Sequence, residues 1–200
     1  EYQDVVVATN SMSDEDWQRI FTFSWAVQCF HCLGLTQNIA ILFRRQFGLN
    51  YSDFYERLIG YFAANNQTLV GQQLTVISEI ITKAMCGGRL DLVLPRFGDI
   101  YWPLEEATFL NFVTDKERFY REIEDFVRIL AVGLHLTVED AFISDLIAYQ
   151  SSLVIDPFSS ELSVELRYDL HDYFNSFGYS KAEIKQARNG LVIKADKDFA

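Results

Sequence analysis

The longest apolar stretch of this 200-residue chain runs from Ile20 to Phe43, and it constrains the fold more than any other segment. Five polar side chains interrupt it: Ser24, Gln28, His31, Gln37 and Asn38. A helix that spans a bilayer needs about 20 predominantly apolar residues in a row, so the interruptions favour a buried helix inside a folded domain. We predict one long helix from Asp14 to Phe47, with Gly34 as the place where it can bend.

The segment before this helix has the residues that start one. Ser13 can cap the first turn, and Asp16 stands three residues later, at the second position of a capping box. Gly48 ends the helix, because glycine adopts the left-handed conformation that closes many helices. Helical spacing and turn residues predict further helices over five segments: Ser52–Ala64, Leu69–Met85, a short one from Pro103, Asp115–Val132 and Thr137–Ser151.

Short strands are expected at both ends of the helical body. The apolar run from Asp4 to Thr9 predicts one strand, and alternating residues from Leu162 to Leu170 predict another. A third run, Leu191–Ala195, can pair with either of them. The segment Arg89–Ala107 holds two of the three prolines and is predicted to be a surface loop.

The predicted fold is therefore mainly α with minor β: a multi-helix body flanked by short strands at the N- and C-terminal ends. We expect one helical domain over residues 1–200. It comprises a strand in residues 1–10 that joins a sheet, a helical body over 13–152, and short strands and a helix over 153–200.

Charge excludes some partners. The net charge is -11 and the pI is about 4.6, without a run of basic residues, which argues against binding to nucleic acid or to an anionic membrane surface. Three cysteines and no apolar signal segment favour a reducing cytoplasm over a secreted disulfide framework. The chain begins at Glu1 without methionine, and we expect both ends to be cut from a longer protein.

The segment AVQCFHCLGL places Cys29, His31 and Cys32 close together, which raises the question of a metal site. C-x-x-C is a common first half of a zinc site, but no second half follows. On an α-helix His31 would lie about 160° from Cys29, so the histidine would face away from that cysteine. We predict that Cys29 and Cys32 pack in the core and that the chain holds no metal, with a metal site and a redox pair as open alternatives.

The same helical projection groups polar side chains into one stripe. Ser24, Gln28, His31 and Asn38 fall within about 80° of one another on an otherwise apolar helix. Buried polar groups need partners, so the stripe either bonds to neighbouring backbone or lines a ligand cavity. The candidates for a substrate cavity are Ser24, Gln28 and His31, with Trp25 at the flank.

No known catalytic motif is present. The chain has no glycine-rich phosphate loop, no G-x-S-x-G, no H-E-x-x-H and no calcium-loop pattern. Glu105 and Glu106 suit the positive end of a helix as well as they suit acid–base chemistry. No catalytic residue is predicted in this chain.

Four segments, in order, resemble one family. VVVATNSMSDEDWQRIFTFSWAVQCFHCLGLTQNIA, LNYSDFYERLIGYF, FGDIYWPLEEATFL and RYDLHDYF are similar to the region after the radical SAM barrel in cobalamin-binding radical SAM proteins of the methyltransferase type. The resemblance covers most of the chain, and it rests on aromatic and helix-forming residues.

The resemblance implies a division of labour within a longer parent chain. In that family an N-terminal domain binds cobalamin, and a central barrel holds S-adenosylmethionine and a [4Fe-4S] cluster on a C-x-x-x-C-x-x-C loop. The C-terminal region helps to shape or cover the substrate cavity. This chain has no such cysteine loop.

The resemblance therefore implies that the chain is a C-terminal region that is not catalytic alone and binds no cofactor by itself. Its partners would be the barrel and the cobalamin domain of the parent, and a small-molecule or peptide substrate. The parent reaction would be methyl transfer to an unactivated carbon or phosphorus centre. The alternative is a free-standing helical interaction module without enzymatic activity.

Overall fold

A computed structural model describes residues 6–154, 161–176 and 184–194. These residues form a mainly α fold with minor β, as predicted. The α-helices are α1 Asp14–Ala26, α2 Gln37–Phe47, α3 Tyr51–Ala64, α4 Leu69–Ala84, α5 Leu104–Thr114, α6 Lys116–Gly133, α7 Asp140–Leu153 and α8 Leu170–Asn175. A π-helix, η1 (Val27–Cys32), follows α1, and a 3-10 turn, η2 (Pro95–Phe97), precedes β2. The strands are β1 Asp91–Val93, β2 Tyr101–Pro103, β3 Glu161–Tyr168 and β4 Gln186–Lys194.

The start of α1 confirms the predicted capping box. The Ser13 side chain accepts a hydrogen bond from the backbone N–H of Asp16 at 3.2 Å, and the Asp16 carboxylate accepts one from the N–H of Ser13 at 3.4 Å. These two bonds satisfy backbone donors that a helix start otherwise leaves without partners.

The prediction of one long helix to Phe47 is wrong. After Ala26 the backbone widens into η1, and the chain then turns through residues 33–36 before α2 begins. Gly34 has a φ of +83°, a left-handed conformation that suits glycine, and the axes on either side of the break differ by 93°. Among the described residues no single helix is long and apolar enough to cross a membrane. The two helical segments Asp14–Cys32 and Gln37–Phe47 reach the required length and apolar composition only when counted together, and they are bent by 93°.

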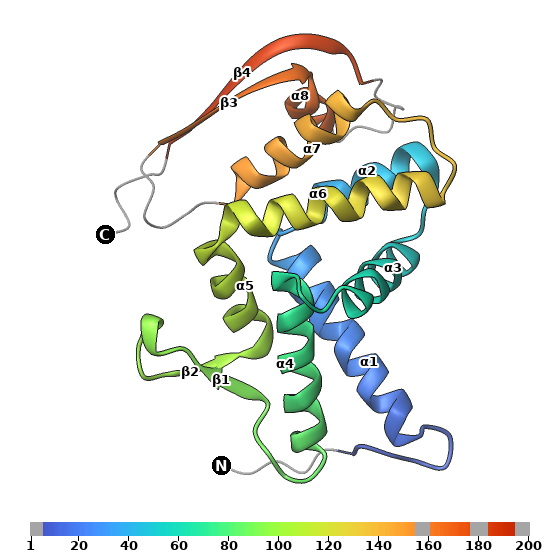
Figure 1. The fold of residues 1–200 in the computed structure, drawn as a ribbon, viewed down its shortest axis with the longest axis vertical. Helices are drawn as coiled ribbons and strands as arrows, with labels where there is room; N and C mark the ends of the chain where they lie inside the picture. Colours follow the sequence, from blue (N-terminus) through green and yellow to red (C-terminus); the bar gives the residue numbers. More distant parts are fainter. Residues whose placement is uncertain (1–5, 155–160, 177–183, 195–200) are drawn as a thin grey trace.

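An aromatic core joins the elements around this break. In Figure 1, α1, α4 and α5 lie in the lower part of the molecule together with β1 and β2, and α6 runs horizontally above them, in contact with α4 and α5. Phe30 of η1 packs on Phe112 and Phe119, whose ring centroids are 4.6 Å apart. Phe54 of α3 meets Phe126 of α6 edge-on. These buried rings hold η1 and α3 against the same core.

The segment predicted as a surface loop contains a small hairpin instead. β1 and β2 pair antiparallel, with Leu92 opposite Trp102 and Val93 opposite Tyr101. The prolines do not prevent this, because Pro95 lies in η2 and Pro103 is the last residue of its strand. Proline is tolerated at such edge positions of short strands.

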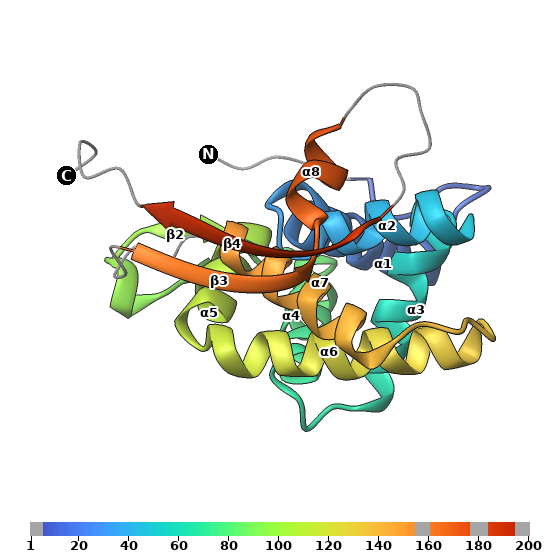
Figure 2. The ribbon, with the colours of Figure 1, turned by 90° about the horizontal axis from the view of Figure 1, so that it is seen from above.

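Of the two pairings left open for the run Leu191–Ala195, the structure shows the one with the alternating strand. β3 and β4 pair antiparallel, with Val164 opposite Leu191, and Figure 2 shows the ribbon curving across α7. The predicted N-terminal strand is not seen in residues 6–10, where Thr9 makes only an isolated bridge to Met12. The rest of that prediction, Asp4 and Val5, lies outside the described residues, as does Ala195.

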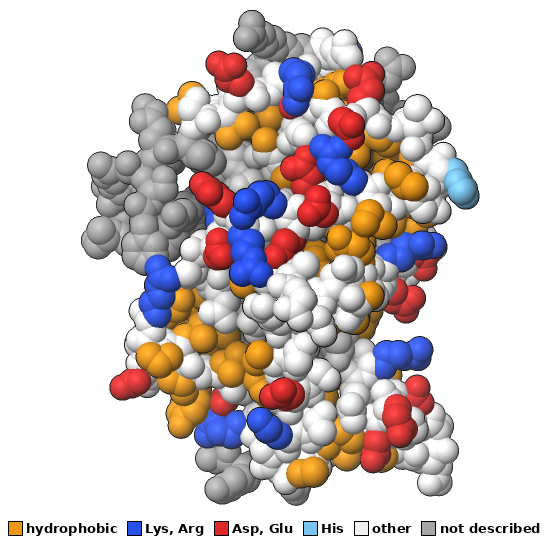
Figure 3. Space-filling view, viewed as in Figure 1, with side chains coloured by type: hydrophobic (Ala, Val, Ile, Leu, Met, Phe, Trp, Pro, Cys, Tyr) orange, Lys and Arg blue, Asp and Glu red, His pale blue; other side chains and the backbone are white. Residues whose placement is uncertain are grey.

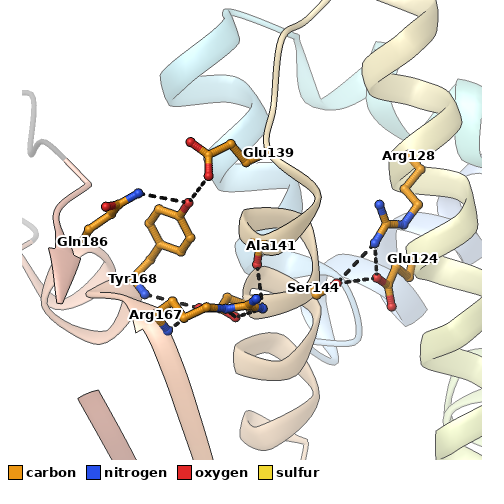
Figure 4. Close-up of polar contacts among 9 residues, drawn as sticks. Glu124, Arg128, Glu139, Ala141, Ser144, Arg167, Tyr168 and Gln186 are labelled. Carbon is orange, nitrogen blue, oxygen red and sulfur yellow. Dashed lines mark hydrogen bonds and ion pairs between the residues drawn. The ribbon is translucent and has the colours of Figure 1, made fainter. Parts of the chain in front are cut away.

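A buried carboxylate ties the ribbon to α7. Asp145 is 3% exposed and accepts hydrogen bonds from the backbone N–H groups of Arg167 and Tyr168. The guanidinium of Arg167 also donates to Asp145, and the Tyr168 hydroxyl donates to Glu139 at 2.9 Å. Figure 4 shows these contacts. Beside them, Glu124 of α6 accepts hydrogen bonds from Arg128 and Ser144. The anchor sits at the end of β3, where the strand register shifts between Leu166 and Tyr168.

Most of the outer face of α6 is charged, with Ile129 and Val132 exposed near its C-terminal end. Figure 3 shows acidic and basic side chains mixed across the middle of the molecule, where α6 runs. Arg118 pairs with Glu122 at 3.1 Å, and Arg128 pairs with Glu124 at 2.7 Å, each one helical turn apart. This is the solvated, ion-paired helix face that the alternating charges of the sequence indicate.

Candidate functional site

The break between α1 and α2 is the most irregular backbone around the predicted site residues. The N–H of Leu33 bonds to the carbonyl of Gln28 at 2.9 Å, a π-type bond across five residues, and the N–H of Thr36 bonds to the carbonyl of Phe30 at 2.7 Å. Single π-turns inside helices occur frequently at functional sites. The break is therefore the candidate functional region of this chain.

Buried polar side chains from distant helices hold the break in shape. Gln150 of α7, which is fully buried, donates to the carbonyl of Gly34 at 2.6 Å and accepts from the N–H of Asn38 at 2.8 Å. The Tyr120 hydroxyl donates to the carbonyl of Leu35 at 3.0 Å, and burial raises the pKa of Tyr120, which keeps it a donor. These bonds satisfy the backbone groups that the break releases.

His31 is the titratable residue at the break, and it is half-buried against two tyrosines. Its Nδ1 lies 2.9 Å from the hydroxyl of Tyr55, and its ring meets Tyr51 and Tyr55 edge-on at centroid distances of 5.3 and 5.8 Å. Burial lowers the pKa of His31 and raises the pKa of Tyr55. Both groups are therefore neutral near pH 7.

The Tyr55 contact leaves one side of the imidazole free. Nδ1 is engaged by the hydroxyl, while Nε2 has no hydrogen bond to any residue in the part of the chain that the structure describes. A neutral imidazole can donate or accept through that nitrogen, depending on the tautomer. The contact with Tyr55 orients the ring, so Nε2 is an oriented hydrogen-bonding group without a partner among the described residues.

The predicted polar stripe is divided in the structure. Ser24 and Gln28 are exposed and lie one turn apart, with the Gln28 amide donating to the Ser24 hydroxyl at 3.1 Å. Asn38 lies beyond the break in α2, where Gln150 binds its backbone. Ser24, Gln28 and His31 thus remain along α1 and η1, while Asn38 is separated from them by the turn.

Trp25 lies on the core side of this helix. It is 2% exposed, and its indole N–H donates to the hydroxyl of Thr108 at 3.1 Å. Thr108 in turn donates to the carbonyl of Leu104 at 2.7 Å and accepts from Gln73 at 3.3 Å. Trp25 therefore supports the Ser24–Gln28 face from behind and does not share its surface.

The two cysteines of the motif have different surroundings. Cys29 is buried in the core, as predicted, and burial raises the pKa of its thiol well above the usual range. The prediction is wrong for Cys32, which is exposed. The π-turn explains the difference, because its wider turn rotates side chains away from the positions expected for an α-helix.

The described residues do not gather metal ligands. No group of three or more His, Cys, Asp or Glu side chains within those ranges lies close enough to hold an ion. Cys32 and Cys86 are exposed, and both are free thiols, as is Cys29. The thiols of this chain therefore do not fit an iron–sulfur cluster, which needs several thiolates converging on one point.

Sequence reasoning missed the residues that shape the break. Tyr55 follows a pattern typical of core aromatics, and nothing local links it to His31. The sequence did indicate a role for Gln150. Its amide lies among apolar residues of a buried helix, and a buried amide needs hydrogen-bond partners.

The sequence of this chain is similar to those of curated enzymes. No protein-family model matches the chain. A 2-(S-pantetheinyl)-carbapenam-3-carboxylate methyltransferase from Streptantibioticus cattleyicolor is 28% identical over 167 residues, which covers 77% of this chain and 24% of that protein. The cobalamin-dependent radical SAM methyltransferase TokK from Streptomyces tokunonensis is 25% identical over 213 residues, which covers 98% of this chain and 30% of TokK.

The chain thus spans about a quarter to a third of the length of these curated relatives. Both relatives are methyltransferases, and one of them is a cobalamin-dependent radical SAM enzyme. At the level of sequence the chain is methyltransferase-like.

Proposed function

We propose that this chain is the C-terminal region of a B12-dependent radical SAM methyltransferase and that it shapes and covers the substrate cavity without being catalytic alone. The observation that carries the proposal is the coverage of the two alignments. They take in 77% and 98% of this chain but only 24% and 30% of the relatives. Most of each relative therefore has no counterpart in these residues.

The cofactors of the parent would be bound elsewhere. Cobalamin, S-adenosylmethionine and a [4Fe-4S] cluster would belong to the cobalamin domain and the radical SAM barrel of the same chain. The thiols here support this division, because Cys29 is buried and protonated while Cys32 and Cys86 are exposed. Three free thiols also suit a reducing cytoplasm.

The face formed by Ser24, Gln28 and His31 would meet the substrate, a small molecule or a peptide. The Gln28 amide and the Ser24 hydroxyl supply donors and acceptors, and Nε2 of His31 adds one that Tyr55 orients. Trp25 backs the face from the core. Closing a cavity over a radical intermediate excludes water and prevents side reactions, which is the role proposed for the helical body.

The parent reaction in this proposal is methyl transfer to an unactivated carbon or phosphorus centre. What the chain's own residues contribute is binding and orientation: hydrogen bonds from the face and a rigid break behind it. Holding the acceptor atom in a fixed position relative to the methyl donor can lower the activation free energy of the transfer by a large amount, because the entropy of bringing the two together is lost on binding.

The full-length reading frame provides the first test. We expect a C-x-x-x-C-x-x-C loop upstream of Glu1 in the same open reading frame. If the frame encodes no such loop, the proposal is wrong and the free-standing interaction module becomes the better reading.

The second test examines the face in the full-length enzyme. The double variant Gln28→Ala/His31→Ala is expected to lower kcat/KM roughly tenfold or more, because each lost hydrogen bond to the substrate costs about 1 kcal/mol. Cobalamin and iron content should not change. The matched control is Gln72→Ala/His171→Ala, which removes exposed residues of the same types on α4 and α8. Unchanged turnover and substrate affinity in the first variant would show that the face does not touch substrate.

A further inference from the structure

A pocket opens between α1 and α3, toward the N-terminal end of α1 from the face described above. Its volume is about 490 Å³, within the range of small-molecule sites. Apolar side chains from both helices line it: Ile20 and Phe23 from α1, and Ile59 from α3. Ile20 is 55% exposed and so presents apolar surface to a ligand.

Gly60 forms part of the wall. It lies in the interior of α3, where glycine is among the least favourable residues for a helix. Its backbone is not in the left-handed region, and a Cβ built on it would meet no atom within 4 Å. Neither backbone conformation nor crowding calls for glycine here, but its missing side chain keeps the pocket open.

Opposite charges lie on the two walls. Arg19 of α1 has an 80% exposed side chain and only a long, exposed contact of 3.9 Å to Asp16. Glu56 of α3 is exposed, and its side chain makes no ion pair or hydrogen bond with any other described residue. Exposed pairs at such distances are weak, so both charges can turn to a ligand.

We propose that this pocket binds a short zwitterion with an apolar body, of the size of a dipeptide. Its carboxylate pairs with Arg19, its ammonium group pairs with Glu56, and its apolar side chains pack on Ile20, Phe23 and Ile59. The pocket adjoins the Ser24–Gln28–His31 face along α1, but its lining does not include those three residues. The proposal does not depend on the function proposed for that face. Binding is non-covalent, and the charged ends select the ligand.

The test is a titration of the isotope-labelled chain with three probes, followed through the backbone amide signals of α1 and α3. The probes are leucyl-phenylalanine, its N-acetyl form, which lacks the cation, and its C-terminal amide, which lacks the anion. We expect the unmodified dipeptide to bind in roughly the millimolar range and each capped form to bind about two- to fivefold more weakly. No shift with the dipeptide, or equal shifts with all three probes, would overturn the proposal.

Variants of the wall locate the site. Gly60→Leu fills the pocket and is expected to weaken dipeptide binding more than tenfold, while Gly60→Ala adds one methyl group and should retain binding. Both variants should fold, because Gly60 has open space over it and glycine is the poorer helix former; circular dichroism checks this. Arg19→Gln should abolish the difference between the dipeptide and its amide. Unchanged binding in folded Gly60→Leu would overturn the location.

Discussion

Two stretches of irregular backbone are held by the same helix, α7, with different chemistry. Near its start Asp145 accepts the N–H groups of Arg167 and Tyr168 at the end of β3. Near its end Gln150 both donates to the carbonyl of Gly34 and accepts from the N–H of Asn38. Both side chains are buried, at 3% and 0% exposure.

The difference follows from what each backbone segment leaves unpaired. At the end of β3 the orphan groups are donors, which a carboxylate can accept two at a time, and the Arg167 guanidinium compensates its charge. At the helix break Gln150 meets one acceptor and one donor, which its amide satisfies together without any charge, while Tyr120 serves the carbonyl of Leu35. The helix break therefore has a neutral anchor beside the neutral His31–Tyr55 pair.

Removing the carboxylate should have the largest effect. Asp145→Ala is expected to lower the free energy of unfolding by roughly 3 kcal/mol, because two backbone N–H groups lose their acceptor. Urea unfolding followed by circular dichroism measures this. Arg167→Ala is the comparison variant and should cost less than Asp145→Ala, because the carboxylate keeps its two backbone donors even though it loses the guanidinium that compensates its charge. Equal costs for the two variants would mean that the ion pair, and not the backbone capping, anchors the ribbon.

Removing the amide should have the next largest effect. Gln150→Ala leaves the Gly34 carbonyl and the Asn38 N–H without their partner and is expected to cost roughly 2 kcal/mol in the same measurement. The matched control is Gln46→Ala, whose exposed side chain makes one bond to Tyr173, and it should cost well under about 1 kcal/mol. A Gln150 variant as stable as this control would show that the break holds its shape without the amide.

The smallest expected effect is a pH dependence of the folding stability, caused by His31 at the break. Burial lowers the pKa of His31 in the folded chain, so the unfolded chain takes up a proton at a higher pH than the folded chain does. Stability is therefore full above the unfolded pKa, near 6.5, and falls as the pH drops from there to the folded value.

Comparing unfolding at pH 7.5 and pH 5.5, two values chosen about one unit to either side of that pKa, measures the effect. His31→Gln should remove the loss of stability that His31 causes on acidification. His135→Asn is the control and should retain that loss. His135 is exposed, and its positive φ suits asparagine, so the substitution should not disturb the fold. If His31→Gln shows the same loss on acidification as the unaltered chain, another group causes it.

Helices and strands were predictable where local chemistry decides them. The Ser13–Asp16 capping box and the alternation before Tyr168 each contain their own evidence within a few residues. The π-turn was not predictable, because the spacing of apolar residues from Ile20 to Phe43 suits a continuous α-helix equally well, and the turn is held by Tyr120 and Gln150 from distant helices.

The candidate site was predictable in part for the same reason. Ser24 and Gln28 lie one regular turn apart, so α-helical projection placed them correctly on one face, but that face is exposed and not buried as predicted. His31 lies within the π-turn, and its partner Tyr55 comes from another helix. No local pattern could show that the histidine would be half-buried and bonded to a tyrosine.

The π-turn also has a consequence for how this segment can evolve. A bond from Leu33 back to Gln28 encloses one residue more than an α-helical bond would. A relative with one residue fewer between Val27 and Cys32 would close an ordinary turn and bring a different side chain to Tyr55. A single inserted or deleted codon there changes the residue at the site while the helices on either side remain, so a one-residue gap in an alignment is informative at this point of the chain.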